Sequence, residues 1–211
     1  WLVGFLTFGM LYWMKNNRVD LYSIRFDVGL VLVFLFGVIS VFVGGLTASN
    51  LMDALGRDGT LTGRTDVWAS LLPMALQRTV LGHGFGGFWT NTSRTTFEIS
   101  DAHSGYLDIL LDMGFVGLLL VTIFLLVSIS KAQKRLKYDF SWSSLWISYI
   151  LMAAVHNITE TSLNSLSSHL TAILVFMAIT STVAPLRHRI RQQEFQLWLK
   201  KQMFLSFKLK K

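Results

Sequence analysis

The sequence contains no cysteine, only two prolines and only 15% charged residues over its length of 211. The absence of cysteine excludes disulfides, thiolate nucleophiles and cysteine-ligated metal sites. A soluble domain of this size carries about 25% charged residues, so this chain has too little polar surface to face water on all sides. Disorder is excluded as well, because 52% of the residues are apolar and 13% are aromatic. These proportions indicate an integral membrane protein.

The sequence contains several long runs of apolar residues. A helix needs about 20 residues to cross a bilayer, and a first run of 14 residues is followed by four longer ones, at 28–46, 107–129, 142–158 and 166–183. The first run, 1–14, lacks the basic start and the cleavage site of a signal peptide. We therefore expect an all-α, multispanning helical bundle that forms a single membrane domain over 1–211, as the C-terminal fragment of a longer protein that begins inside a span.

Basic residues are distributed unevenly between the connections. Of the 19 Lys and Arg residues, 15 fall on one side of the expected spans, eight of them in the tail 185–211. The positive-inside rule assigns this side to the cytoplasm and the long connection 47–106 to the outer face. The tail is either an interfacial helix or a plain positive-inside anchor. Topology thus explains the net charge of +7, and no nucleic-acid partner is expected.

The connection 47–106 is too rich in apolar residues to be disordered. The spacing of its apolar residues predicts a short helix with Thr62 or Thr65 as N-cap, lying at or dipping into the membrane surface. Pro73 should kink or shorten that helix. The GHGFGG sequence at 82–87 forms either tight turns that present N–H groups to an anion or a plain cluster of turns.

Two residues of this connection are candidates for chemistry. His103 lies just before the run 107–129, where an imidazole near its titration range can take a proton from a sugar hydroxyl. Arg64 offers a fork of donors that matches phosphate oxygens. The alternatives are a binding or structural histidine and a solvated or headgroup-binding arginine.

The acidic residues are interleaved with arginines, which favours salt bridges over a metal site. This applies to Asp58, Asp66 and Asp101, of which Asp66 could also orient Arg64 or a sugar hydroxyl. Two further carboxylates, Asp108 and Asp112, share one face at the start of the run 107–129, where a shallow position would make them ordinary interfacial groups.

A second polar segment lies at the outer end of the span at 142–158. It contains His156, Asn157 and Glu160, which either line a sugar-binding cleft opposite His103 or form a structural polar cap.

Three segments in this order resemble the O-antigen ligase and polymerase family of bacterial envelopes. They are GRDGTLTGRTDVW at 56–68, LGHGFGGFW at 81–89 and AHSGYLDILLDMGFVGLLL at 102–120. With HNITETSLNS at 156–165, the pattern is most similar to the exopolysaccharide polymerases of that family. The resemblance implies a glycosyltransferase of GT-C type in the bacterial inner membrane, with its active site on a long periplasmic loop.

The resemblance also implies partners. The donor would be an undecaprenyl-diphosphate-linked glycan and the acceptor a glycan or the lipid A core, with membrane lipids around the protein and a chain-length regulator as a further partner. Neither a cofactor nor a metal is expected. Ligase and polymerase are not separated by these motifs.

The family's essential histidine corresponds to His103, as the base that activates the acceptor, and its GR-x-x-x-W arginine corresponds to Arg64, which would hold the diphosphate. The remaining candidates for substrate binding are Arg57, Arg78, Arg94, Asp66, Tyr106 and Glu160. The competing hypotheses are a transporter or flippase component without catalysis, and a scaffolding subunit. A transporter would be expected to carry broken helices or ionisable groups at mid-membrane, which the expected spans lack at their centres.

Overall fold

A computed structural model describes residues 1–21, 23–55, 62–165 and 168–180. Arg57, Asp58 and the basic tail 185–211 lie outside the described residues. The chain divides into two compact units, Trp1–Leu174 and Val175–Lys211. Every contact discussed below belongs to the first unit.

The described residues are helical, with no strand among them. The helices are α1 (Leu2–Asn16), α2 (Phe26–Leu55), α3 (Thr62–Gln77), α4 (Asn91–Phe97), α5 (Gly105–Arg135) and α6 (Phe140–Thr159). A shorter apolar helix follows at His169–Thr180. The prediction of an all-helical chain is therefore confirmed over the part that the structure describes.

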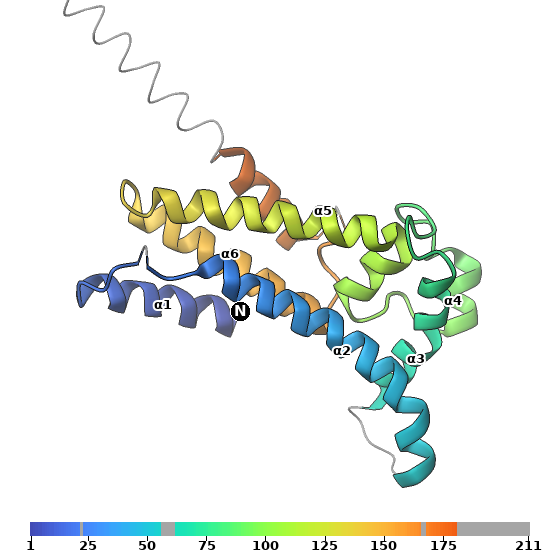
Figure 1. The fold of residues 1–211 in the computed structure, drawn as a ribbon. Coiled ribbons are helices and arrows are strands. Elements are labelled where there is room, and N and C mark those ends of the chain that lie inside the picture. The colour runs from blue at the N-terminus through green and yellow to red at the C-terminus, as the bar shows by residue number, and fades with distance from the viewer. Residues whose placement is uncertain (22, 56–61, 166–167, 181–211) are drawn as a thin grey trace, which may run out of the picture. The chain divides into compact units, whose positions relative to one another are not determined.

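Four helices form the body of the first unit (Figure 1). Helix α6 packs against α1, α2 and α5, while α2 packs against both α5 and α3. At one end of these helices, the Gln133 side chain donates to the Ile24 carbonyl (2.8 Å) and the Lys15 ammonium lies 4.1 Å from the centre of the Phe140 ring. This end gathers the basic residues of the two short connections, which are Lys15, Arg18, Arg25, Lys131, Lys134, Arg135 and Lys137.

The long connection and the segment after α6 meet at the opposite end, where α5 begins. The Gly105 N–H there donates to the Glu160 carbonyl (3.1 Å). The two short basic connections thus lie at one end of the helices and the long connection lies at the other, as the sequence predicts.

Two of the described helices, at Phe26–Gly44 and Gly105–Arg135, are long and apolar enough to cross a membrane. Helix α6 covers the expected span 142–158 but is not among them, and the run 166–183 is helical from His169 to Thr180 within the described residues. The number of complete spans therefore stays a prediction.

The helix predicted inside the long connection is α3, and it differs from the prediction in length. It begins at Thr62 and continues through Pro73 to Gln77. Proline at this position removes one backbone hydrogen bond. Leu71, Leu72 and Ala75 are buried around Pro73, and their packing explains why the helix is not shortened there, whereas the kink stays a prediction.

Helix α5 is interrupted at Gly114, whose φ of 62° and ψ of −160° are not helical. The interruption frees backbone groups on both sides of it. On one side, the N–H groups of Phe115 and Val116 donate to the carbonyls of Thr79 (2.8 Å) and Val80 (3.2 Å). Because buried backbone groups need partners, the segment after α3 takes the place of the missing helical turn.

The same segment completes the other side of the interruption. The N–H of His83 donates to the Leu111 carbonyl (2.9 Å), and the N–H of Gly84 donates to the Asp112 carbonyl (2.7 Å). The N–H groups of Gly82 and Gly87 also donate to backbone carbonyls. The GHGFGG sequence is therefore a cluster of turns that pairs with α5, which favours the plain-turn alternative over an anion-binding loop.

We expect Gly114→Ala to destabilise the protein. A Cβ atom at this position would lie 2.4 Å from the Val80 carbonyl oxygen, and the backbone conformation alone costs a non-glycine residue about 1–3 kcal/mol. Thermal unfolding of the purified full-length protein in detergent measures the loss. Gly29→Ala is the matched control, because nothing lies within 4 Å of its added methyl group; equal unfolding temperatures for the two variants would contradict the prediction.

Candidate functional site

His103 is held by its neighbour Asp101 in the turn that precedes α5. A carboxylate oxygen of Asp101 accepts from the His103 backbone N–H (2.9 Å) and lies 3.3 Å from the imidazole Nδ1. The partner of one ring nitrogen decides which nitrogen carries the proton, so Asp101 favours a proton on Nδ1 and a free lone pair on Nε2. The imidazole is 42% exposed, which leaves it accessible to a substrate.

The backbone of His103 is itself in the left-handed region, with φ at 49°. A non-glycine residue rarely takes this conformation, although histidine does so more often than most. Such strain persists only where the surroundings enforce it. Here the enforcing groups are Asp101 on one side and the buried start of α5 on the other.

Arg64 reaches the same end of the molecule and pairs with Glu160. Its guanidinium lies 3.2 Å from the Glu160 carboxylate, with both side chains about half exposed. An ion pair this exposed contributes little to stability and exchanges easily. Because the Glu160 carbonyl accepts from Gly105, the pair lies next to the turn that carries His103.

The position of Arg64 follows from Trp68, one helical turn later in α3. The indole of Trp68 is buried and donates to the Ala102 carbonyl (2.9 Å). Residues four apart share one face of a helix. Trp68 therefore anchors this face of α3 to the residue before His103 and directs Arg64 toward the same turn.

Beneath His103 lies the carboxylate of Asp108, which is fully buried in the first turn of α5. It accepts hydrogen bonds from the Trp89 indole (2.7 Å), from the Ala102 N–H (3.2 Å) and from the Thr161 hydroxyl. A buried charge is costly unless it is paired or hydrogen-bonded. These donors come from three separate segments, so Asp108 joins the loop before α4, the turn of His103 and the segment after α6.

Asp112 repeats this arrangement one helical turn further along α5. Its carboxylate is 1% exposed and accepts from the Phe88 N–H (3.0 Å) and the Asn164 amide (2.6 Å). Neither aspartate is an exposed group, and this burial was not visible in the sequence, whereas their depth in the membrane stays a prediction. Their spacing of four was the available signal, since it places two carboxylates on one face of an apolar helix.

The remaining predicted residues are distributed over this end of the molecule. Tyr106 is 1% exposed, donates its hydroxyl to the Ala154 carbonyl (2.6 Å) and packs edge-on against Phe34. Asp66 on α3 and Arg94 on α4 are exposed. Tyr106 thus packs in the core, whereas the other two are free to contact a ligand.

Arg78 lies apart from Arg64, just beyond the end of α3. Fourteen residues of helical rise separate them by roughly 21 Å. The neighbouring Thr79 and Val80 pair with α5 beyond Gly114. The structure therefore brings together His103, Asp101, Arg64 and Glu160, and it does not add Arg78 to them.

The last turn of α6 supplies a structural cap, and Glu160 follows it. Asn157 is fully buried; its amide donates to the Ala153 carbonyl and the Ser162 hydroxyl, and its oxygen accepts from the N–H groups of Ser162 and Leu163. Its role is the polar cap that was one of the two alternatives. No group of three or more His, Asp or Glu residues within the described ranges is placed to hold a metal ion.

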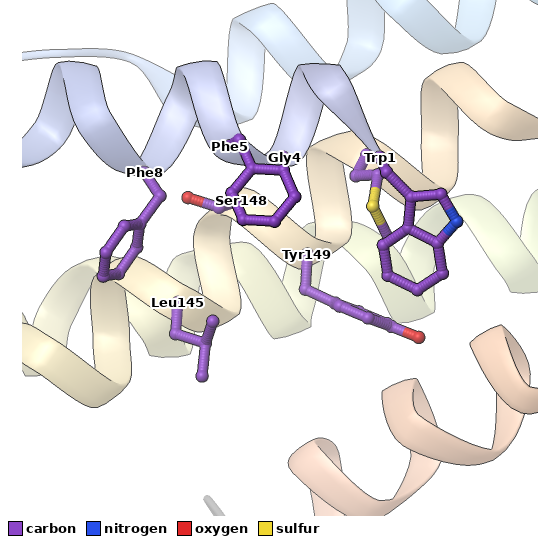
Figure 2. A pocket seen from close by; sticks show the side chains of 8 residues that line it. Trp1, Gly4, Phe5, Phe8, Leu145, Ser148 and Tyr149 are labelled. Atoms are coloured by element: carbon purple, nitrogen blue, oxygen red, sulfur yellow. The ribbon is translucent and has the colours of Figure 1, made fainter.

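A separate pocket of about 230 Å³ lies between α1 and α6, away from these residues (Figure 2). Its two polar side chains are engaged, since Ser148 donates to the Ser144 carbonyl and Tyr149 to the Leu170 carbonyl. The pocket is otherwise apolar and offers no group for catalysis. It is lined by Trp1, Gly4, Phe5, Phe8, Leu145, Ser148, Tyr149 and Met152.

We expect Asp108→Ala to lower the unfolding temperature of the full-length protein by several degrees. The substitution leaves the Trp89 indole and the Thr161 hydroxyl without their acceptor, and each buried unsatisfied group costs about 1–3 kcal/mol. Differential scanning fluorimetry in detergent measures the change. Asp66→Ala removes an exposed carboxylate and serves as the control; a loss no larger than the control's would refute the assignment.

Comparison with known proteins agrees with these observations. A family model described as O-Antigen ligase matches residues 1–122, which include both Arg64 and His103. A relative, the exopolysaccharide production protein ExoQ of Rhizobium meliloti (strain 1021), is 26% identical over 113 residues, covering 47% of this chain and 25% of the relative. The chain therefore matches about a quarter of that relative's length, and no solved structure matches it. With more than half of its length matched, and with the predicted resemblance confirmed, the chain belongs to the O-antigen ligase family.

Proposed function

We propose that the chain carries the active site of a membrane glycosyltransferase that builds cell-surface polysaccharide. Its substrates would be an undecaprenyl-diphosphate-linked glycan donor and a glycan or lipid A core acceptor. The observation that carries the proposal is the meeting of two pairs, His103 with Asp101 and Arg64 with Glu160, at one end of the helices. Transfer of a glycan from a diphosphate requires a base for the acceptor hydroxyl and a cation that can leave its own partner to bind the diphosphate.

In the proposed reaction, Nε2 of His103 takes the proton of the acceptor hydroxyl as its oxygen attacks the anomeric carbon of the donor. The new glycosidic bond forms while the bond from that carbon to the diphosphate breaks, and the diphosphate leaves with the electron pair. A single displacement of this kind inverts the anomeric centre. Asp101 stabilises the imidazolium that forms, because its carboxylate lies beside Nδ1.

Arg64 would release its partner Glu160 and bind the diphosphate of the donor instead. A guanidinium matches phosphate oxygens with two parallel donors, and the exposed ion pair costs little to open. Glu160 would then be free to accept a hydrogen bond from a sugar hydroxyl. Asp66 and Arg94 remain candidates for contacts with the glycans, whereas Tyr106 is assigned to packing.

The proposal includes the placement of the protein in the bacterial inner membrane. The end that gathers the basic residues would face the cytoplasm, as the positive-inside rule requires. The end with His103 and Arg64 would then face the periplasm, where the acceptor is found. The fold of the whole enzyme would be of GT-C type, and no metal would take part.

We expect His103→Ala to reduce glycan transfer by about 10²–10⁴-fold, which is the usual contribution of a general base. The assay uses membranes that contain the full-length protein, supplied with a purified undecaprenyl-diphosphate-linked repeat unit, and resolves products by length. A ladder of products indicates a polymerase, and a single product that needs the lipid A core indicates a ligase. Activity in the presence of EDTA would support a mechanism without metal.

The control for this experiment is His169→Ala, which removes an exposed histidine after α6. It should leave transfer unchanged. Transfer by His103→Ala at the level of this control would overturn the assignment of the base. A wild-type protein that transfers nothing to either acceptor would favour the transporter hypothesis.

Arg64→Lys should retain part of the donor binding that Arg64→Ala loses. Lysine keeps the positive charge but lacks the two-pronged fork of the guanidinium. We expect the KM for the donor to rise in the order wild type, lysine, alanine, measured by transfer at varied donor concentration. An equal KM in all three proteins would remove Arg64 from the diphosphate site.

A further inference from the structure

The segment 76–85, which joins α3 to the turns beside α5, exposes large apolar side chains. Val80, Leu81 and Phe85 each expose between 61% and 69% of their surface, and Leu76 is also exposed. Water-facing loops of this length are usually polar. A concentration of exposed apolar side chains marks a surface that contacts a partner or a membrane.

The backbone of the same segment is paired with protein. The carbonyls of Thr79 and Val80 accept from α5, and the N–H groups of His83 and Gly84 donate to it. The Arg78 carbonyl accepts from Gly82 within the segment. Irregular backbone is tolerated at membrane depth only where its polar groups are satisfied by protein, and these backbone groups of the segment meet that condition.

The segment is also continuous with the apolar surface of a candidate span. Its hydrogen bonds to Phe115 and Val116 place it beside the point where α5 resumes after Gly114. From that point α5 presents a row of exposed apolar side chains, which are Phe115, Val116, Leu119, Leu120 and Ile123. In a helix that crosses the membrane, such a row faces the lipid tails.

We propose that the segment 76–85 is inserted into the outer leaflet of the bilayer, as an apolar wedge that does not cross the membrane. The observation that carries this proposal is the combination of exposed apolar side chains with a backbone already paired to α5. A loop built to face water needs neither feature. The occupant of this surface is the lipid bilayer, because the surface continues the apolar row of α5.

Arg78 sets the depth of the wedge. It is exposed and lies between the apolar residues Leu76 and Val80. A long arginine side chain can bury its stem among lipid tails while its guanidinium reaches the headgroup phosphates. The proposal therefore assigns Arg78 to the lipid headgroups, in agreement with its separation from Arg64. It rests on the orientation in the membrane proposed above, but not on the proposed reaction.

Single cysteines carrying an environment-sensitive fluorophore test the proposal, since the chain has none of its own. Leu81→Cys and Phe85→Cys are made in the full-length protein after replacement of any cysteine elsewhere, and Val80→Cys replaces either variant if it fails to fold. The labelled proteins are reconstituted into vesicles of phosphatidylethanolamine and phosphatidylglycerol, with and without brominated acyl chains. Thr95→Cys on α4 is the water-facing control and Leu119→Cys on α5 the lipid-facing one.

We expect labels at 81 and 85 to show the blue-shifted emission of the label at 119 and to be quenched by brominated lipid several-fold more than the label at 95. Emission like that at 95 would show a water-exposed loop and overturn the proposal. Blue-shifted emission without quenching by brominated lipid would also overturn it, because the surface would then be covered by protein.

Discussion

The interruption of α5 at Gly114 is the constraint on which this end of the molecule depends. It leaves backbone donors and acceptors that would each cost about 1–3 kcal/mol if buried without partners. The segment 79–84 satisfies them through four hydrogen bonds. The path of the chain from α3 to α4 is thereby determined by α5. The turns of α5 before Gly114 contain the buried carboxylates of Asp108 and Asp112, which consequently lie against the connection between α3 and α4.

Those carboxylates determine where the exposed groups lie. Asp108 joins Trp89, Ala102 and Thr161, so it holds the turn of His103 against the segment that supplies Glu160. Neither His103 nor Arg64 is buried, and neither is placed by the apolar core directly. The turn of His103 is held through Ala102, which binds both the Asp108 carboxylate and the Trp68 indole that directs Arg64, and these buried hydrogen bonds allow a half-exposed site to keep a defined shape.

Apolar runs were enough to predict the long helices, and family motifs singled out His103 and Arg64, whose roles stay a prediction. The contacts that hold those residues in place could not be predicted from the sequence. Apart from the nearby Ala102 N–H, the carboxylates of Asp108 and Asp112 accept from donors 19 to 53 residues away along the chain, and no local pattern reports such distances. Gly114 looks like any small residue of an apolar helix, because a break is visible only when the segment that repairs it is known. Pro73 does not end α3 for a related reason, since tertiary packing outweighs a local preference.

The network around Asp108 also has a consequence for how the protein is made. Thr161, one of its three donors, is synthesised 53 residues after Asp108. At about 5–20 residues per second, the ribosome needs roughly 3 to 11 seconds to reach it. Over that interval the start of α5 carries a carboxylate without its full set of donors, and α6 has yet to emerge. The turn of His103 can therefore be completed only after α6 has been synthesised, so its assembly is coupled to a helix that follows it in the chain.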